Sequence, residues 1–150
     1  MAKKIALFLG VFIFTVVLDQ YIKQLILNGF RWDSECISIT LAYNKGVAFS
    51  MFAFLEHNLK FIQIGIFILA LAMTLYYKYF NDYYIGLALI FAGGISNIYD
   101  RFNHIGVVDY VYWHCGFDFA IFNYADVMID LGIVLIIWKY YHLEKLKESN

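Results

Sequence analysis

The chain has no proline and only two cysteines among its 150 residues, and only 15% of its residues are charged. The lack of proline excludes a proline-rich linker and a collagen-like repeat. Two cysteines are too few for a disulfide scaffold, and they lack the C-x-x-C spacing of a zinc site. A net charge of −1 excludes an overall basic field that would recruit nucleic acid. What remains is strongly apolar, because 63% of the residues are hydrophobic and 21% are aromatic.

This composition predicts an integral membrane protein with a single domain over residues 1–150. Four stretches are long and apolar enough to cross the ~30 Å hydrocarbon core of a bilayer as helices. These stretches are Ile5–Leu27, Leu59–Tyr79, Tyr84–Arg101 and Phe122–Tyr141. We therefore expect an all-α membrane protein of four transmembrane helices, with both termini on the same side of the membrane.

The charged residues predict the orientation of these helices. Most lysines outside the helix centres fall on the side of the termini, which is therefore expected to be cytoplasmic. These are Lys3, Lys4, Lys78, Lys139, Lys145 and Lys147. Of the 12 acidic residues, only Asp82, Glu144 and Glu148 lie on that side. The polar chemistry of the chain is thus expected at the outer face.

Two long loops, Asn28–Asn58 and Phe102–Ile121, face that outer side. Within the first loop, Cys36–Tyr43 alternates apolar with small or polar residues, which is typical of a half-buried strand. Asn44–Gly46 is expected to form a turn, because Asn and Gly tolerate positive φ, and Val47–Phe52 returns as a second apolar run. We expect a small β-containing cradle on the outer surface.

Several polar residues lie inside the expected helices, where each is a functional hypothesis because burying it in lipid costs free energy. Asp19 and Lys23 are one helical turn apart, and Asn97, Asp100 and Arg101 share one surface of the third helix. A plain alternative is that Asp19 neutralises Lys23 and that Arg101 pairs with Asp100 at the interface. Asn97 has no such explanation, because its amide needs a hydrogen-bond partner.

Two further carboxylates stand in apolar surroundings, Asp109 in the second loop and Asp126 near the start of the fourth helix. Two carboxylates that share a site hold one proton between them, so one can activate water while the other protonates a carbonyl oxygen. Alternatively, each is a separate acid, with Asp126 capping its helix. Asp130 lies one turn from Asp126 and pairs with it equally well by spacing. Asp100 and Asp118 are further candidates, so spacing predicts a cluster of outer carboxylates without a mechanism.

Other chemistries have little support in the sequence. The four histidines form no H-E-x-x-H motif, and no G-x-S-x-G element or phosphate loop is present. His104 and His114 with Cys115 offer metal ligands, although interfacial histidines among aromatic residues are the commoner case. Cys36 and Cys115 both face the oxidising side and are able to form a disulfide, but nothing in the sequence indicates one.

Read in order, these residues resemble the lipoprotein signal peptidases (signal peptidase II). Five blocks carry the resemblance: Asp19–Lys23, Asn44–Ser50, Gly93–Arg101, Val107–Tyr110 and Phe122–Asp126. They are similar to the aspartate-glutamine-x-x-lysine, asparagine-x-glycine-x-alanine-phenylalanine-serine, asparagine-x-x-aspartate-arginine, valine-valine-aspartate and phenylalanine-asparagine-x-alanine-aspartate elements of the family. Each block is weakly specific alone, whereas five in the right order with the same four-helix layout are highly specific.

The resemblance implies an aspartic-type protease whose catalytic pair is Asp109 and Asp126. It implies cleavage of prolipoproteins just before a cysteine that carries diacylglycerol, at the extracytoplasmic face of the bacterial cytoplasmic (inner) membrane. Membrane lipid is the expected surrounding, and no metal, organic cofactor or nucleic acid is implied. We expect a monomer.

The resemblance also implies supporting roles. Asn97 and Arg101 would hold the substrate backbone, and Asn123 would lie beside the catalytic pair. The remaining site-supporting residues are Asp19, Lys23, Asn44, Gly46, Asp100 and Ala125. The chain departs from the family pattern at Asp130, where an uncharged residue is expected, so this acid is predicted to perturb the pKa of the pair.

Two other function classes make different predictions. A small transporter or proton-relay subunit would distribute carboxylates across the depth of the bilayer, whereas the inner halves of these helices lack them. A structural membrane scaffold would have no need for Asn97, Asp109 and Asn123 together. Replacing Asp109 by Asn separates an enzyme from a scaffold, because a scaffold should tolerate the change.

Overall fold

The computed structural model describes residues 1–46 and 53–148 and contains a helical bundle with a small sheet at one end. The described helices are α1 (Ala2–Leu27), α2 (Glu56–Tyr76), α3 (Phe80–Asn103) and α4 (Tyr124–Glu148), with a short 3-10 helix η2 (Ala53–Leu55) before α2. The strands are β1 (Trp32–Asp33), β2 (Ile37–Asn44) and β3 (Val107–Trp113), paired antiparallel in the order β1-β2-β3. The expected fold of four helices with a small sheet is confirmed.

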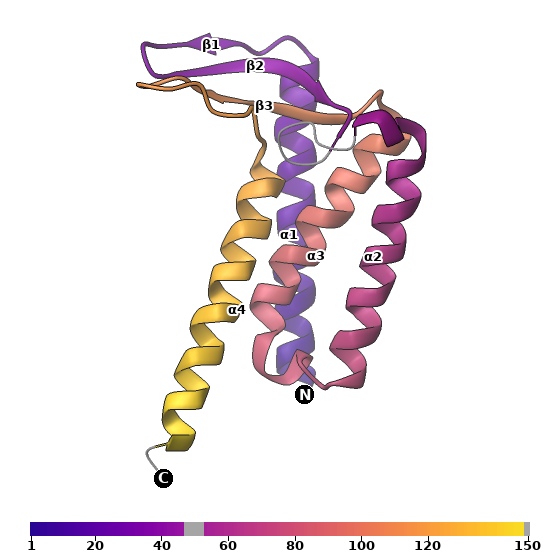
Figure 1. Cartoon of the computed structure of the whole chain (residues 1–150), viewed down its shortest axis with the longest axis vertical. Helices are drawn as coiled ribbons and strands as arrows, with labels where there is room; N and C mark the ends of the chain where they lie inside the picture. The colour runs from indigo at the N-terminus through magenta and orange to yellow at the C-terminus, as the bar shows by residue number, and fades with distance from the viewer. Residues whose placement is uncertain (47–52, 149–150) are drawn as a thin grey trace.

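Figure 1 shows the sheet lying across one end of the bundle, whereas α1 begins and α4 ends at the opposite end. Each expected helix is present, but the connection between α2 and α3 differs from the prediction. The expected helices leave a turn between Tyr79 and Tyr84, whereas the turn is at Tyr77–Tyr79 with Lys78 at a φ of 57°. Phe80 instead packs its ring on Phe8 of α1, with 5.4 Å between centroids, and so belongs to the bundle.

The exterior of the bundle is apolar. Phe14 on α1, Ile66 on α2 and Val134 on α4 leave 64%, 62% and 59% of their surface exposed. Within residues 1–46 and 53–148, two helical segments are long and apolar enough to cross a membrane, Ala2–Leu27 and Asn58–Tyr76. α3 and α4 are not apolar enough to be counted with them, because they carry more polar residues.

The close approach of α3 and α4 depends on small residues. A Cβ added at Gly93 of α3 would lie 2.5 Å from the carbonyl oxygen of Ala125, and one added at Gly132 of α4 would lie 2.6 Å from that of Gly86. Both distances are shorter than any real contact, so no side chain fits at either position. Small residues permit this backbone approach in membrane helix pairs generally, and here it brings the first turn of α4 against α3.

The sheet contains one expected strand and one that was missed. β2 covers Ile37–Asn44, one residue later than predicted, whereas β3 lies in a segment that we expected to be a loop. The register pairs Ala42 with Asp109 and Asn44 with Val107. Because β3 is rich in β-branched and aromatic residues, it suits a partly buried sheet. β3 therefore positions Asp109 on a strand rather than on a loop.

The chain bends after β2, as predicted for Asn44–Gly46. The bend is held by a side-chain hydrogen bond and not by the positive φ angles that we expected. The Asn44 side chain accepts a hydrogen bond from the Gly46 backbone N–H at 3.0 Å, a local contact typical of Asn in turns. Among the described glycines, only Gly29 and Gly116 have positive φ. The expected second apolar run, Val47–Phe52, lies outside the described residues.

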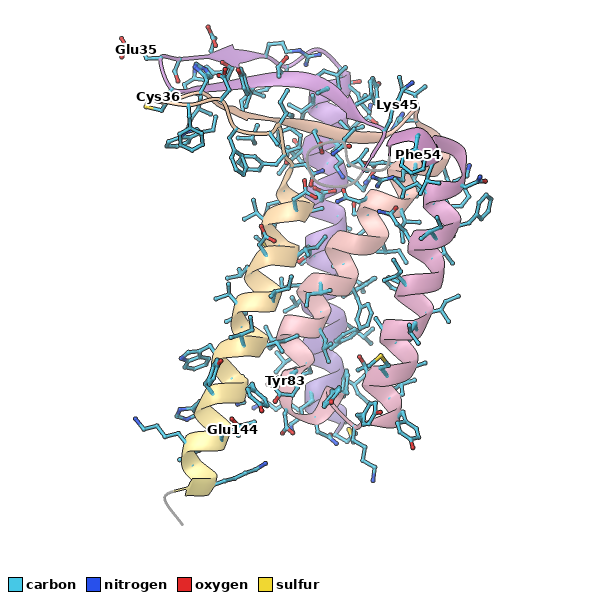
Figure 2. The ribbon with its side chains drawn as sticks, viewed as in Figure 1. Glu35, Cys36, Lys45, Phe54, Tyr83 and Glu144 are labelled. Atoms are coloured by element: carbon cyan, nitrogen blue, oxygen red, sulfur yellow. A yellow bond between two sulfur atoms is a disulfide. The ribbon has the colours of Figure 1, made fainter. Side chains whose placement is uncertain are left out.

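A disulfide joins Cys36 to Cys115, across a sequence separation of 79 residues. The pairing of β2 with β3 places Ile37 opposite Trp113, which brings the two neighbouring cysteines together. Figure 2 labels Cys36 at the tip of the sheet, beyond the helices. The bond therefore fastens the free end of the sheet.

Candidate active site

A buried ion cluster joins α1 to α3. The Lys23 Nζ lies 2.7 Å from a carboxylate oxygen of Asp19 and 2.7 Å from one of Asp100. Lys23 is 1% exposed, and both aspartates are 0% exposed. The plain alternative of a self-contained Asp19–Lys23 pair is therefore incomplete, because Lys23 binds Asp100 as well as Asp19. Asp100 pairs with Lys23 and not, as that alternative held, with Arg101.

The two carboxylates of this cluster also hold the elements that carry the candidate catalytic residues. Asp19 accepts hydrogen bonds from the Ala125 backbone N–H at 2.9 Å and from the Ser96 hydroxyl at 2.6 Å. Asp100 accepts one from the Val108 backbone N–H at 3.1 Å. Ala125 precedes Asp126, and Val108 precedes Asp109. The ion cluster therefore fixes the start of α4 and the start of β3 relative to each other.

Asp109 and Asp126 lie close to each other and are connected by two asparagine side chains. Asn123 Nδ2 donates to Asp109 at 2.6 Å, and Asn97 Nδ2 donates to Asp126 at 2.8 Å. The two amides also meet, because Asn123 Nδ2 lies 3.2 Å from Asn97 Oδ1. Lys23 completes the network by donating to that same oxygen at 2.9 Å. The amide of Asn97 thus has the partners that its position demands.

Asp126 additionally caps its own helix. Its carboxylate accepts from the Asn123 backbone N–H at 3.1 Å, while Asn123 Oδ1 accepts from the Asp126 backbone N–H at 2.9 Å. This reciprocal pair is the capping-box arrangement. The alternative in which Asp126 caps a helix is therefore correct in geometry, and the same carboxylate also lines the cavity that Asp109 lines.

The competing carboxylates lie elsewhere or lack such connections. Asp118 accepts a hydrogen bond from the Tyr112 hydroxyl at 2.7 Å on the exposed side of the sheet. Asp130 lines the same cavity as the pair, but no hydrogen bond or ion pair joins it to another residue within 1–46 or 53–148. Among the described residues, no group of three or more His, Cys, Asp or Glu side chains is placed to hold a metal ion.

A cavity of about 350 Å³ opens beside the two carboxylates. Asp109 and Asp126 lie in its wall together with Asn44, Asn97 and Arg101. The rest of the wall is mainly apolar and comes from Val107, the segment 119–122 and Ile129. A peptide with apolar side chains would fit such a wall while its backbone meets the polar groups.

The environment of Asp109 favours its protonated form. The pKa of Asp109 is raised from its ordinary value of 3.8 to about 7. Burial is the main cause, and the negative charge of Asp126 is the second. Hydrogen bonds from Asn123 and Asn44 oppose the increase. At neutral pH this carboxyl is therefore poised to give and take a proton, as an acid–base catalyst requires.

Arg101 ties the end of α3 to the bend after β2. Its guanidinium donates to the Gly46 backbone carbonyl and to the Asn97 carbonyl, the latter at 3.3 Å. Asn44 holds that bend from the other side through Gly46. All residues that the sequence predicted for the site thus lie in the hydrogen-bond network or in the cavity wall.

Sequence reasoning did not assign three polar residues at this site. Gln20 donates to Asp100 at 2.9 Å and to Ser96 at 2.8 Å, so both belong to the ion cluster. Gln20 stands within the Asp19–Lys23 block, which could have indicated its role. Gln63 of α2 lines the cavity, and a single glutamine inside an apolar run was its only signal.

Comparison with known proteins agrees with the resemblance found in the sequence. The signal peptidase (SPase) II family model matches residues 11–142. The lipoprotein signal peptidase of Wolinella succinogenes is 57% identical over 145 residues, covering 95% of this chain and 99% of that protein. That of Helicobacter pylori strain 26695 is 47% identical, covering 95% and 92%. A solved bacterial membrane enzyme is 26% identical with a TM-score of 0.75, covering 100% of this chain and 91% of that one.

Proposed function

The chain belongs to the signal peptidase II family, and we propose that it hydrolyses the bond before a diacylglyceryl-modified cysteine with Asp109 and Asp126 as its catalytic pair. Family membership makes it a bacterial membrane protease that processes prolipoproteins. The catalytic assignment rests on one observation: these two carboxylates, from β3 and α4, line one cavity and are connected through Asn97 and Asn123.

The pair performs general acid–base catalysis with one shared proton. Asp109 holds the proton, since its pKa is raised to about 7, and Asp126 is the ionised base. Asp126 takes a proton from water while the water oxygen bonds to the scissile carbonyl carbon and Asp109 protonates the carbonyl oxygen. In the second step Asp126 protonates the leaving nitrogen, Asp109 recovers a proton from the diol, and the C–N bond breaks. Both carboxyls then regain their starting states.

The other site residues position the pair or contact the substrate. Asn97 and Asn123 hold the two carboxylates, and the Asp19–Lys23–Asp100 cluster holds the backbone on which they stand. Arg101 donates hydrogen bonds to the backbone carbonyls of Asn97 and Gly46. A guanidinium has five N–H groups, so others are left to bind a ligand. We assign its remaining N–H groups to the substrate backbone.

The proposal includes the arrangement in the membrane. All four helices span the bilayer, both termini are cytoplasmic, and the sheet with the site faces outward. Two features support this arrangement. Figure 1 shows the start of α1 and the end of α4 away from the sheet, and toward these ends the sequence places Lys3, Lys4, Lys139, Lys145 and Lys147. The exterior of the helices is apolar. The enzyme would act as a monomer surrounded by lipid, with no cofactor.

A cleavage assay in detergent or lipid tests the function. The purified protein receives a diacylglyceryl-modified prolipoprotein and its unlipidated counterpart. We expect cleavage of the lipidated form alone, loss of cleavage in Asp109→Asn and in Asp126→Asn, and normal cleavage in Asp118→Asn, which changes an exposed carboxylate. The rate should fall above about pH 7 as Asp109 loses its proton, and again in acid as Asp126 gains one.

Two results would count against this assignment. A rate that stays constant over several pH units would contradict a shared proton. Failure of folded wild-type protein to cleave either substrate would instead favour the proton-relay function for the outer carboxylates.

A further inference from the structure

Gln63 brings an unsatisfied polar group from α2 into the wall of the catalytic cavity. Its side-chain oxygen is buried and accepts no hydrogen bond from any residue that the structure describes. A buried carbonyl without a donor costs free energy, so such groups are rare unless a ligand supplies the donor. Gln63 has no role in the network that holds Asp109 and Asp126.

Asp130 brings a second unused acceptor into the same cavity, from α4. It lies one helical turn beyond Asp126, about 6 Å further from the outer end of α4. Its side chain is exposed, and it forms no ion pair or hydrogen bond with the parts of the chain that the structure describes. An ionisable residue at membrane depth is costly and is a functional hypothesis by default.

The substrate of the proposed reaction needs hydrogen-bond acceptors at this depth. A helical peptide satisfies its own backbone groups, so its scissile carbonyl is not available to water and two carboxyls. The segment before the cleaved bond must therefore be extended, and its N–H groups then lie in a region where no water can accept their hydrogen bonds. In the proposed orientation this segment approaches from the membrane interior.

We propose that Gln63 and Asp130 together bind the backbone of the signal peptide, each accepting a hydrogen bond from an N–H group of the residues that precede the modified cysteine. This inference rests on the proposed function, because it assumes that the cavity receives a signal peptide. Gln63 holds the chain from the α2 side and Asp130 holds it from the α4 side, one turn below Asp126.

The chemistry of the two groups selects the peptide over the lipid as their ligand. The Gln63 side-chain oxygen and the Asp130 carboxyl oxygens are hydrogen-bond acceptors, so they require donors. The diacylglyceryl group contains ester oxygens and hydrocarbon, none of which donates a hydrogen bond. The neighbouring apolar wall at Ile121, Phe122 and Ile129 suits the apolar side chains of a signal peptide rather than a cationic group.

Removing single backbone N–H groups from the substrate tests the proposal. A series of lipidated prolipoprotein peptides carries one N-methyl amide at each of the four positions before the cysteine. kcat and KM are measured for wild type, Gln63→Leu, Gln63→Glu, Asp130→Leu and Asp130→Asn. Thr74→Val is the matched control, because Thr74 is a polar residue of α2 whose hydroxyl donates to the Ala70 carbonyl of its own helix at 2.8 Å.

We expect Gln63→Leu and Asp130→Leu each to lower kcat/KM about tenfold on the unmodified peptide, as the loss of a buried hydrogen bond does. Gln63→Glu and Asp130→Asn keep an acceptor and should retain more activity than the leucine variants. N-methylation at one position should cost wild type about tenfold and cost Gln63→Leu less than twofold. A second position should behave in the same way with Asp130→Leu.

If N-methylation costs the leucine variants as much as it costs wild type at every position, neither side chain accepts these hydrogen bonds and the proposal is overturned. The same follows if the leucine variants cleave like Thr74→Val. The catalytic proposal is judged separately, by whether Asp109→Asn abolishes cleavage of the unmodified peptide.

Discussion

Replacing Asp109 by Asn should stabilise the protein while abolishing its activity, and the gain should depend on pH. Burial and the charge of Asp126 raise the pKa of Asp109 from 3.8 to about 7. Between these values the folded protein binds a proton that the unfolded chain does not, so the free energy of unfolding falls as the pH rises. The loss begins near pH 4, grows through the interval and is complete above about pH 7.

The size of this loss follows from the pKa change. A rise of about 3 pKa units corresponds to about 4 kcal/mol, which is an upper bound for the gain in Asp109→Asn at pH 8. The amide keeps the shape of the carboxyl without its charge, so the penalty disappears. For a chain of this length, each kcal/mol moves the melting temperature by about 2–4 °C. We therefore expect an increase of several degrees at pH 8 and almost none at pH 4.

Thermal unfolding in detergent, followed by the fluorescence of the three tryptophans, measures this effect. Asp118→Asn is the control, because Asp118 is exposed and should give a small change at both pH values. Asp126→Asn should move the pH-dependent loss of stability to lower pH, since the charge that raises the pKa of Asp109 is gone. An equal stability difference between wild type and Asp109→Asn at pH 4 and pH 8 would refute the reasoning.

Two further predictions concern the scaffold. Lys23→Met should destabilise the protein by about 3–5 kcal/mol, because it leaves two buried carboxylates without their cation; the melting temperature should recover in part when Asp100→Asn is added. Gly93→Ala should lower both the melting temperature and kcat, because the new methyl group would lie 2.5 Å from a backbone oxygen of α4. Gly94→Ala should leave both unchanged, since its nearest neighbour would be 3.9 Å away; equal effects of the two changes would show that helix approach at Gly93 is not critical.

The helices could be predicted because each contains a mostly apolar stretch of about the length that crosses a bilayer, although α3 and α4 carry more polar residues than α1 and α2. The strand β3 was missed because it lies in a loop between two helices and pairs with β2 across more than 60 residues of sequence. Its composition, Val107–Trp113, is nevertheless typical of a strand. The disulfide was missed for the same reason, since it depends on that long-range pairing.

The candidate site was only partly predictable from spacing. Asp126 and Asp130 are one turn apart, which is visible in the sequence, whereas Asp109 and Asp126 are brought together by contacts among α1, α3, β3 and α4. The spacing of residues could not decide between these two pairs, and only the resemblance to a known family indicated Asp109 with Asp126. Gln63 was predicted neither from residue spacing nor from the family resemblance, because it belongs to none of the five matched blocks.

One lysine connects the two halves of the proposed catalytic apparatus. Lys23 binds Asp19, which holds the backbone next to Asp126, and it binds Asp100, which holds the backbone next to Asp109. The separation of the two carboxyls is therefore set by charges on α1 and α3 that do not line the cavity. Burial raises the pKa of Asp109, and the positive charge of Lys23 opposes that rise, so the ion cluster also acts on this carboxyl. A buried charge network that looks purely structural in the sequence thus holds the two carboxyls of the proposed catalytic pair in place.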